Sequence, residues 1–163
     1  MPEQSPPSTP PPTRLFVDAD ACPVKEETYR VGARYGLKCY VVANSFMQVP
    51  PSALIERVIV DAGPDVADAW IAERCGGRDI VITNDIPLAE LCLKAGSQVL
   101  KPNGQAFTLD SIGASLAQRA IMEHIRSTGG ITGGPPPFDR NDRSRFLQAL
   151  DLAVQKARKR TGA

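Results

Sequence analysis

Four short apolar runs in this chain each give way, within a few residues, to Asp or Asn. The runs are rich in β-branched residues and show no alternation of polar and apolar positions, which is typical of strands buried on both faces of a parallel sheet. Parallel strands end at the same edge of a sheet, and ligands bind outside that edge. We therefore expect the Asp and Asn side chains to meet there. The four segments are residues 15–20, 40–44, 58–61 and 80–85.

Helix-like stretches alternate with the apolar runs along most of the chain. Gly36 and Gly96 follow two of these stretches, where glycine is a common helix end. The alternation predicts an α/β fold, a three-layer α/β/α sandwich around one central parallel sheet. The predicted strands are residues 14–18, 37–43, 57–61, 79–83 and 97–100, and the first three predicted helices are residues 23–35, 65–75 and 87–96.

Two longer amphipathic helices are predicted after the last strand. Asp110 is placed to cap the first of them, at residues 111–126. Apolar residues recur at helical spacing in both, so each is expected to pack one face on the domain. These residues are Ile112, Leu116, Ala120 and Ile121 in the first helix, and Phe146, Leu150, Val154 and Ala157 in the second.

Length and composition indicate one domain behind a tail. Residues 1–13 are rich in proline and hold no aliphatic residue after Met1, which predicts a disordered tail, and residues 14–160 are enough for a single domain with a core. The tail has neither the basic nor the apolar region of a signal peptide, and no apolar stretch is long enough for a membrane span, so we expect a cytoplasmic protein without membrane contact. A net charge of +1 argues against a purely electrostatic nucleic-acid binder.

The acids at the predicted edge form a candidate metal site. Asp18 and Asp20 leave the first strand on alternate positions, Asp65 and Asp68 share a helix face, and Asp85 follows the fourth strand. Each alone could be a helix cap. Capping does not require acids after several strands, however, and gathered carboxylates repel unless a cation lies between them. Oxygen ligands favour Mg²⁺ or Mn²⁺, which can activate water against a phosphodiester.

Other common chemistries find little support in the residues. No P-loop, Rossmann glycine pattern or nucleophile elbow is present, and the single histidine, His124, is expected at the surface of a helix. The cysteines lack the spacing of a zinc site and are expected to be reduced and structural. Cys22, beside the acids, is the one candidate for a reactive thiol.

Three segments carry a resemblance to a known family. Asp18, the run Ala-Asp-Ala-Trp-Ile-Ala at 67–72 and the run Val-Ile-Thr-Asn-Asp-Ile-Pro-Leu-Ala at 81–89 resemble the PIN-like (NYN/PIN) nuclease superfamily. The resemblance implies that Asp18, Asp68 and Asp85 form a Mg²⁺ or Mn²⁺ site that cuts single-stranded nucleic acid, with RNA favoured. Residues 18–23, 64–68 and 83–89, with the late Gly-Gly-Pro loop, are more closely similar to the uncharacterised bacterial YaiI/YqxD family, placed among PIN-like proteins and without a settled substrate.

The resemblance has one departure and leaves substrate contacts to be assigned. Many PIN domains carry an acid between strands two and three, where Glu56 is the only candidate here, so Asp20 and Asp65 would take its place. Arg119 borders the buried face of its helix, where it meets either a phosphate or, with its head in water, no anion at all. The side chains assigned to substrate are Asn44, Thr83, Asn84, Lys101 and Arg119.

Other readings of the same residues stay open. A receiver-like phosphoacceptor would use Asp18, Asp20, Asp61, Thr83 and Lys101, and phosphatases of the haloacid-dehalogenase type also begin with Asp-x-Asp after a strand. A PIN-like module could also bind metal or nucleic acid without turnover. The loop at 129–137, anchored by Phe138, is expected to cover the acidic edge or else to be disordered. Oligomeric state is left open.

Overall fold

The structure is a computed structural model that describes residues 12–20, 22–63, 65–127 and 138–159. Within this range the side chains of Ser115, Arg119, Arg126 and Ser127 are not described. The predicted tail at 1–11 and the predicted covering loop at 129–137 lie outside the described residues. Ten elements follow one another in the order β1 Arg14–Asp18, α1 Lys25–Tyr35, β2 Lys38–Ala43, β3 Ile55–Ile59, α2 Val66–Ala72, β4 Ile80–Ile82, α3 Ile86–Lys94, β5 Gln98–Leu100, α4 Leu109–Ser127 and α5 Arg140–Lys159.

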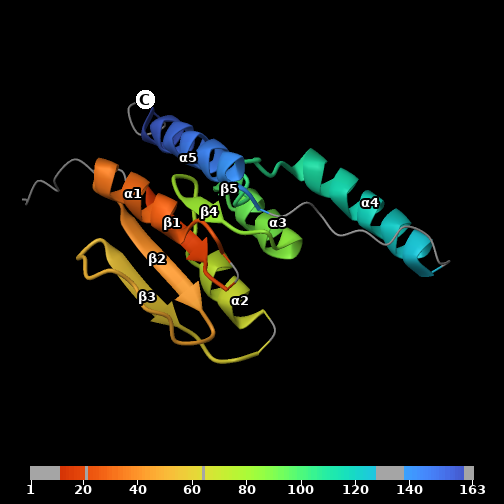
Figure 1. Ribbon diagram of the computed structural model, residues 1–163, viewed down its shortest axis with the longest axis horizontal. Helices are drawn as coiled ribbons and strands as arrows, with labels where there is room; N and C mark the ends of the chain where they lie inside the picture. The colour runs from red at the N-terminus through yellow and green to blue at the C-terminus, as the bar shows by residue number, and fades with distance from the viewer. Residues whose placement is uncertain (1–11, 21, 64, 128–137, 160–163) are drawn as a thin grey trace, which may run out of the picture.

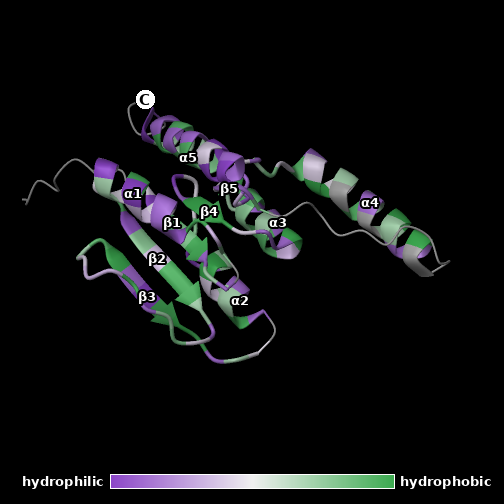
Figure 2. Cartoon of the chain, in the orientation of Figure 1, coloured by the Kyte–Doolittle hydropathy of each residue, from purple (hydrophilic) through white to green (hydrophobic). Residues whose placement is uncertain are grey.

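The five strands form one sheet in the order β3-β2-β1-β4-β5, and every neighbouring pair is parallel. The sheet is buried on both faces because successive residues of β1 enter different cores. Leu15 and Val17 pack with α1 and α5, whereas Phe16 packs with α2 and α3. Figure 1 shows these helices on the two faces, and Figure 2 shows the apolar strands between them. The predicted three-layer α/β/α sandwich is confirmed.

The topology changes direction between β1 and β4. The connection from β1 through α1 leads to β2 on one side of β1, whereas the connection from β4 through α3 leads to β5 on the other side. The two helices also lie on opposite faces of the sheet. Such a switch point opens a crevice at the carboxyl ends of the two central strands.

Several predicted boundaries and one predicted cap are corrected. β3 spans Ile55–Ile59 rather than 57–61, because these residues pair with Cys39–Ala43 of β2. α2 is shorter than predicted and begins after Asp65. Thr108, not Asp110, caps α4, since the Ser111 amide donates to the Thr108 hydroxyl at 3.0 Å.

The last two helices pack differently from each other. All four apolar residues predicted for α5 are buried, as expected. Of the four apolar residues predicted to pack in α4, only Ile112 is buried, while Leu116, Ala120 and Ile121 are exposed, so the predicted packing face of this helix is wrong beyond its first turn. Figure 1 shows α4 pointing away from the sheet. No helix in the described part of the chain is long and apolar enough to cross a membrane.

Candidate acidic site at the switch point

A cleft of about 320 Å³ lies at the carboxyl ends of β1 and β4. β1 ends in Asp18 and the turn after β4 supplies Asp85, so the switch point itself places these two acids on one edge of the sheet. The prediction that they share an edge is therefore confirmed. The cleft is lined by Asp18, Asp20, Cys22, Thr83, Asn84, Asp85 and Pro102.

Thr83 links the two central strands at the cleft. Its buried hydroxyl donates to Oδ2 of Asp18 at 2.8 Å and accepts the backbone N–H of Asp85 at 2.9 Å. A hydroxyl has one proton, so the donation to Asp18 fixes its orientation. The sequence predicts Thr83 as a substrate-binding residue, and that role stays a prediction. In the structure its hydroxyl holds the Asp18 carboxylate and the Asp85 backbone in place.

Asp85 combines two roles at the start of α3. Its Oδ1 accepts the backbone N–H of Leu88 at 2.8 Å, which is the usual bond of an N-cap aspartate. The bond uses one of the two carboxylate oxygens and fixes the carboxylate plane at the rim of the cleft. Asp85 can therefore cap α3 and also be a candidate metal ligand.

Asp68 brings a third carboxylate to this edge from α2. Burial raises the pKa of Asp68 to about 6, and the charges of Asp85, Asp18 and Asp65 add to the rise. Burial also raises the pKa of Asp18, against the lowering effect of the Thr83 hydrogen bond, and Asp85 and Asp20 act in the same direction as burial. The carboxylates are thus close enough to disfavour each other's ionised forms.

We expect Asp68→Asn to stabilise the protein at pH 7.5 in EDTA, by about 1 kcal/mol after allowance for solvent screening of this half-buried group. The folded-state pKa lies above the unfolded value of 3.8, so the contribution of Asp68 to stability is full at low pH and is lost as pH rises through about 6. The measurement is urea unfolding between pH 4.5 and 8.

Asp61→Asn is the matched control for this experiment. Asp61 is exposed and is not among the charges that act on Asp68. Its replacement should leave the pH profile of stability as it is in the wild type. A destabilised Asp68→Asn protein at pH 7.5 would show that the carboxylate is favourably placed and that the repulsion is absent.

Asp20 and Asp65 are exposed at the margin of the acidic group. Oδ2 of Asp20 accepts the backbone N–H of Asn44 at 3.2 Å, which ties the end of β2 to the residues after β1. Asp65 has a left-handed backbone with φ of 69° and makes no side-chain cap bond to α2. A non-glycine residue in this region is strained, and such strain is often found at functional sites.

Of the other residues predicted to bind substrate whose side chains the structure describes, only Asn84 lines the acidic cleft. Asn84 is exposed and lines the cleft. Asn44 reaches the site through its backbone N–H only. Lys101 is half-buried, with Nζ 4.9 Å from the centroid of the Phe107 ring, and its neighbour Pro102 forms the wall instead. Arg119 lies in α4, and the position of its side chain is not described.

Two further acids do not belong to the site. Glu56, the candidate for a missing PIN acid, lies within β3 opposite Tyr40 and forms an ion pair with Lys38 at 3.7 Å. Asp61 is exposed beyond the end of β3, which is an edge strand separated from β1 by β2. In a receiver, the strand before the phosphoacceptor lies next to the first strand. The strand order therefore argues against the receiver-like reading.

All four cysteines are free and buried. Burial raises the pKa of Cys22, which disfavours the thiolate, so the structure does not support a reactive role for it. A hydrogen bond from the Cys92 thiol lowers the pKa of Cys75 to about 6, and the same contact raises that of Cys92. This contact between Cys75 and Cys92 could not be predicted from the sequence, because the two residues are 17 positions apart and belong to different elements.

Comparisons with known proteins identify the family of this chain. The model of the uncharacterised YaiI/YqxD family matches residues 16–156, from β1 to α5. The chain belongs to this family. It is 60% identical over 145 residues to a UPF0178 protein of Caulobacter vibrioides strain NA1000 / CB15N, covering 89% of this chain and 95% of that relative. It is 57% identical over 148 residues to a UPF0178 protein of Gluconobacter oxydans, covering 91% and 85%. No solved structure matches the chain.

Membership of the YaiI/YqxD family confirms the closer of the two resemblances and leaves the PIN-like placement a prediction. Every acid assigned to the metal falls within the part of the chain that the YaiI/YqxD model covers. The donor atoms suit a hard divalent cation, since they are carboxylate oxygens that already repel each other. Among the described residues, however, no three Asp, Glu, His or Cys side chains are grouped closely enough to hold one ion as they stand. Metal binding would therefore have to draw the three carboxylates closer together.

Proposed function

We propose that this chain binds Mg²⁺ or Mn²⁺ through Asp18, Asp68 and Asp85 and is a nuclease-like phosphodiester hydrolase acting on single-stranded nucleic acid, with RNA favoured. The observation that carries the proposal is the gathering of three carboxylates at a topological switch point, where burial and, after it, the charges of the neighbouring acids raise the pKa of Asp68. Carboxylates gathered without counter-charge are unfavourable for stability, and a cation would reverse the sign of their interaction. The PIN-like resemblance of the same three positions supports the reaction class.

The residues of the chain have distinct tasks in this proposal. Asp18, Asp68 and Asp85 would hold the ion, with Asp20 and Asp65 beside them. A bound Mg²⁺ or Mn²⁺ supplies positive charge for the phosphodiester and lowers the pKa of water. Thr83 keeps the Asp18 carboxylate turned to the cleft, and the bond to Leu88 does the same for Asp85. The exposed Asn84 amide, in the cleft wall, is suited to donate to a phosphate oxygen.

The proposal also predicts how the affinity for the metal ion depends on pH. A protonated Asp68 cannot serve as a ligand, and its pKa is raised to about 6 without metal. Metal binding requires that proton to leave, so the apparent affinity should fall as pH drops below about 6.

The deciding experiment compares wild type with Asp85→Asn at pH 7.5. Asparagine caps a helix as well as aspartate does, so the fold should persist while a charged ligand is lost. Titration calorimetry with Mn²⁺ should give at least a tenfold weaker affinity for the variant. A fluorescent pool of single-stranded RNA and DNA should be cut by wild type in Mn²⁺, left intact in EDTA and left intact by the variant.

Asp61→Asn is again the control, because it removes an exposed carboxylate outside the cleft. It should bind Mn²⁺ and cut the pool as wild type does. Wild type that binds Mn²⁺ at the Asp85-dependent site but cuts neither nucleic acid would favour the non-catalytic binding module. Wild type that binds no Mn²⁺ would refute the metal site itself.

A further inference from the structure

We infer that Phe46, backed by Arg57, is a stacking platform for one base of a single-stranded nucleic acid on the same edge of the sheet as the acidic cleft. The inference rests on the proposed function, since it concerns how the same substrate would be held. Phe46 lies in the segment that follows β2, and it is 70% exposed. No other Phe, Tyr or Trp side chain in the described part of the chain is exposed.

The ring of Phe46 is held from one side. The guanidinium carbon of Arg57 lies 4.3 Å from the ring centroid, and Arg57 Nη1 donates to the backbone carbonyl of Met47 at 3.2 Å. The arginine on β3 thus fixes both the ring and the chain next to it. With one face covered by Arg57 and most of the residue exposed, the other face is open to water. A preformed, open aromatic face is what base stacking requires, and stacking accepts every base.

Other cation–aromatic pairs in the chain have buried or half-buried rings. Arg14 lies over the buried ring of Phe16, and Arg74 lies over the half-buried indole of Trp70, where the rings pack with each other and with the core. Isolated exposed aliphatic side chains such as Leu152 are ordinary in soluble proteins. Phe46 differs because its ring is exposed, supported by a cation and placed at the functional edge.

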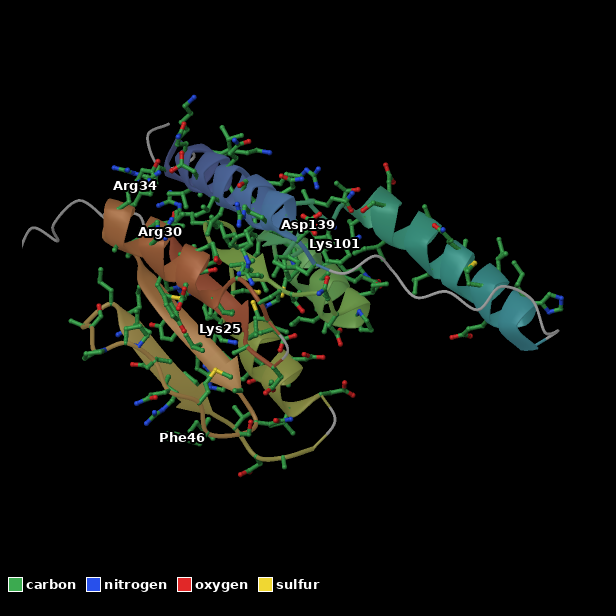
Figure 3. All side chains as sticks on the ribbon, viewed as in Figure 1. Lys25, Arg30, Arg34, Phe46, Lys101 and Asp139 are labelled. Atoms are coloured by element: carbon green, nitrogen blue, oxygen red, sulfur yellow. The ribbon has the colours of Figure 1, made fainter. Side chains whose placement is uncertain are left out.

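The platform lies close to the acids. The backbone N–H of Asn44 donates to Asp20 in the cleft, and Phe46 is only two residues further along, which is about 7 Å of extended chain at most. Figure 3 shows Phe46 at the lower margin of the molecule, beside β3. A base stacked there would belong to the same strand as a phosphate at the acids. The charge of Arg57 would meet the strand's phosphates, which the acids alone would repel.

The test measures binding separately from cleavage. Fluorescence anisotropy in EDTA compares a single-stranded oligonucleotide of twelve thymidines with an abasic strand of equal length, using the full chain. Phe46→Ala should weaken binding of the base-containing strand by about tenfold and leave the abasic strand unchanged, because one stacked base is lost. Phe46→Trp should retain the preference and show indole fluorescence quenched by the thymidine strand but not by the abasic strand.

Leu152→Ala is the matched control, since it removes a similarly exposed apolar side chain from α5. It should change neither affinity. The inference is overturned if Phe46→Ala leaves the ratio of the two affinities unchanged, or if wild type binds neither strand. If Phe46→Ala lowers the ratio of the affinities for the thymidine and abasic strands while wild type shows no Mn²⁺-dependent cleavage, the stacking platform is upheld and only the nuclease activity is rejected. Failure of the platform and failure of the proposed function therefore give different results.

Discussion

Asp79→Ala should destabilise the fold by about 4 kcal/mol, which corresponds to about 10 °C in melting temperature. The Asp79 side chain is only 5% exposed and accepts four hydrogen bonds at the amino end of the sheet. Two come from the Arg14 guanidinium at 2.8 and 3.2 Å, and two from the backbone N–H groups of Arg14 and Gly76 at 3.0 and 2.8 Å. Alanine would leave all four donors without this acceptor in a place that water reaches poorly.

Glu90→Ala supplies the comparison. Glu90 pairs with Lys94 at the same 2.8 Å, but both side chains are well exposed on α3. An exposed pair one helical turn apart contributes about 0.5 kcal/mol at most. Guanidinium unfolding of the two variants should therefore differ by several kcal/mol in free energy. A loss below about 1 kcal/mol for Asp79→Ala would mean that water replaces the carboxylate and that this ion pair does not anchor β1 to the residues before β4.

Gly104→Ala is expected to destabilise the protein by about 3 kcal/mol. Gly104 follows β5 with φ of 91°, a conformation that L-residues rarely adopt. A Cβ atom there would lie 2.8 Å from the backbone carbonyl of Arg145 in α5. Because the clash is with backbone atoms and not with a flexible side chain, the turn or α5 must move to relieve it. Pro102, in the same turn, lines the acidic cleft, and its position should change with the turn.

Gly113→Ala is the control of opposite sign. Gly113 lies in α4, where an added Cβ meets nothing within 4 Å. Alanine there should raise stability by about 0.5–1 kcal/mol through helix propensity. Chemical unfolding of both variants gives the measurement. Equal stability of Gly104→Ala and wild type would show that the close approach between the turn and α5 relaxes without cost.

The central strands could be predicted from sequence because most of their residues are buried on one face of the sheet or the other. β1 spans the predicted residues 14–18, and Gly36 ends α1 with the left-handed φ of 66° expected of a glycine cap. β3 was placed two residues too late because an edge strand exposes part of its length, so its apolar run does not mark its ends. The apolar spacing of α4 could not reveal that this helix extends beyond the sheet, since spacing shows a face and not its partner.

The candidate site could be predicted in part for a similar reason. Strand direction alone places Asp18 and Asp85 at one edge, and the structure confirms that placement. The role of Thr83 in holding Asp18 depends on β4 lying next to β1. Strand order of this kind cannot be predicted from the local sequence. The proposed role of Phe46 could not be predicted from the sequence, because it depends on the exposure of the ring and on its contact with Arg57. Both follow from the pairing of β2 with β3.

The position of β1 in the middle of the sheet has a consequence for how the chain is made. Its partner on one side, β2, follows after a single helix, but its partner on the other side, β4, begins only at Ile80. During synthesis from the N-terminus, β1, β2 and β3 can therefore pair while the second edge of β1 still exposes unpaired backbone and the buried-type residues Leu15, Phe16 and Val17. Until Ile80–Ile82 has been synthesised, that edge of β1 is open to a strand from another chain. The pairing of β1 with β4 closes this edge and ends the risk of aggregation there, and the same pairing brings Asp18 and Asp85 together.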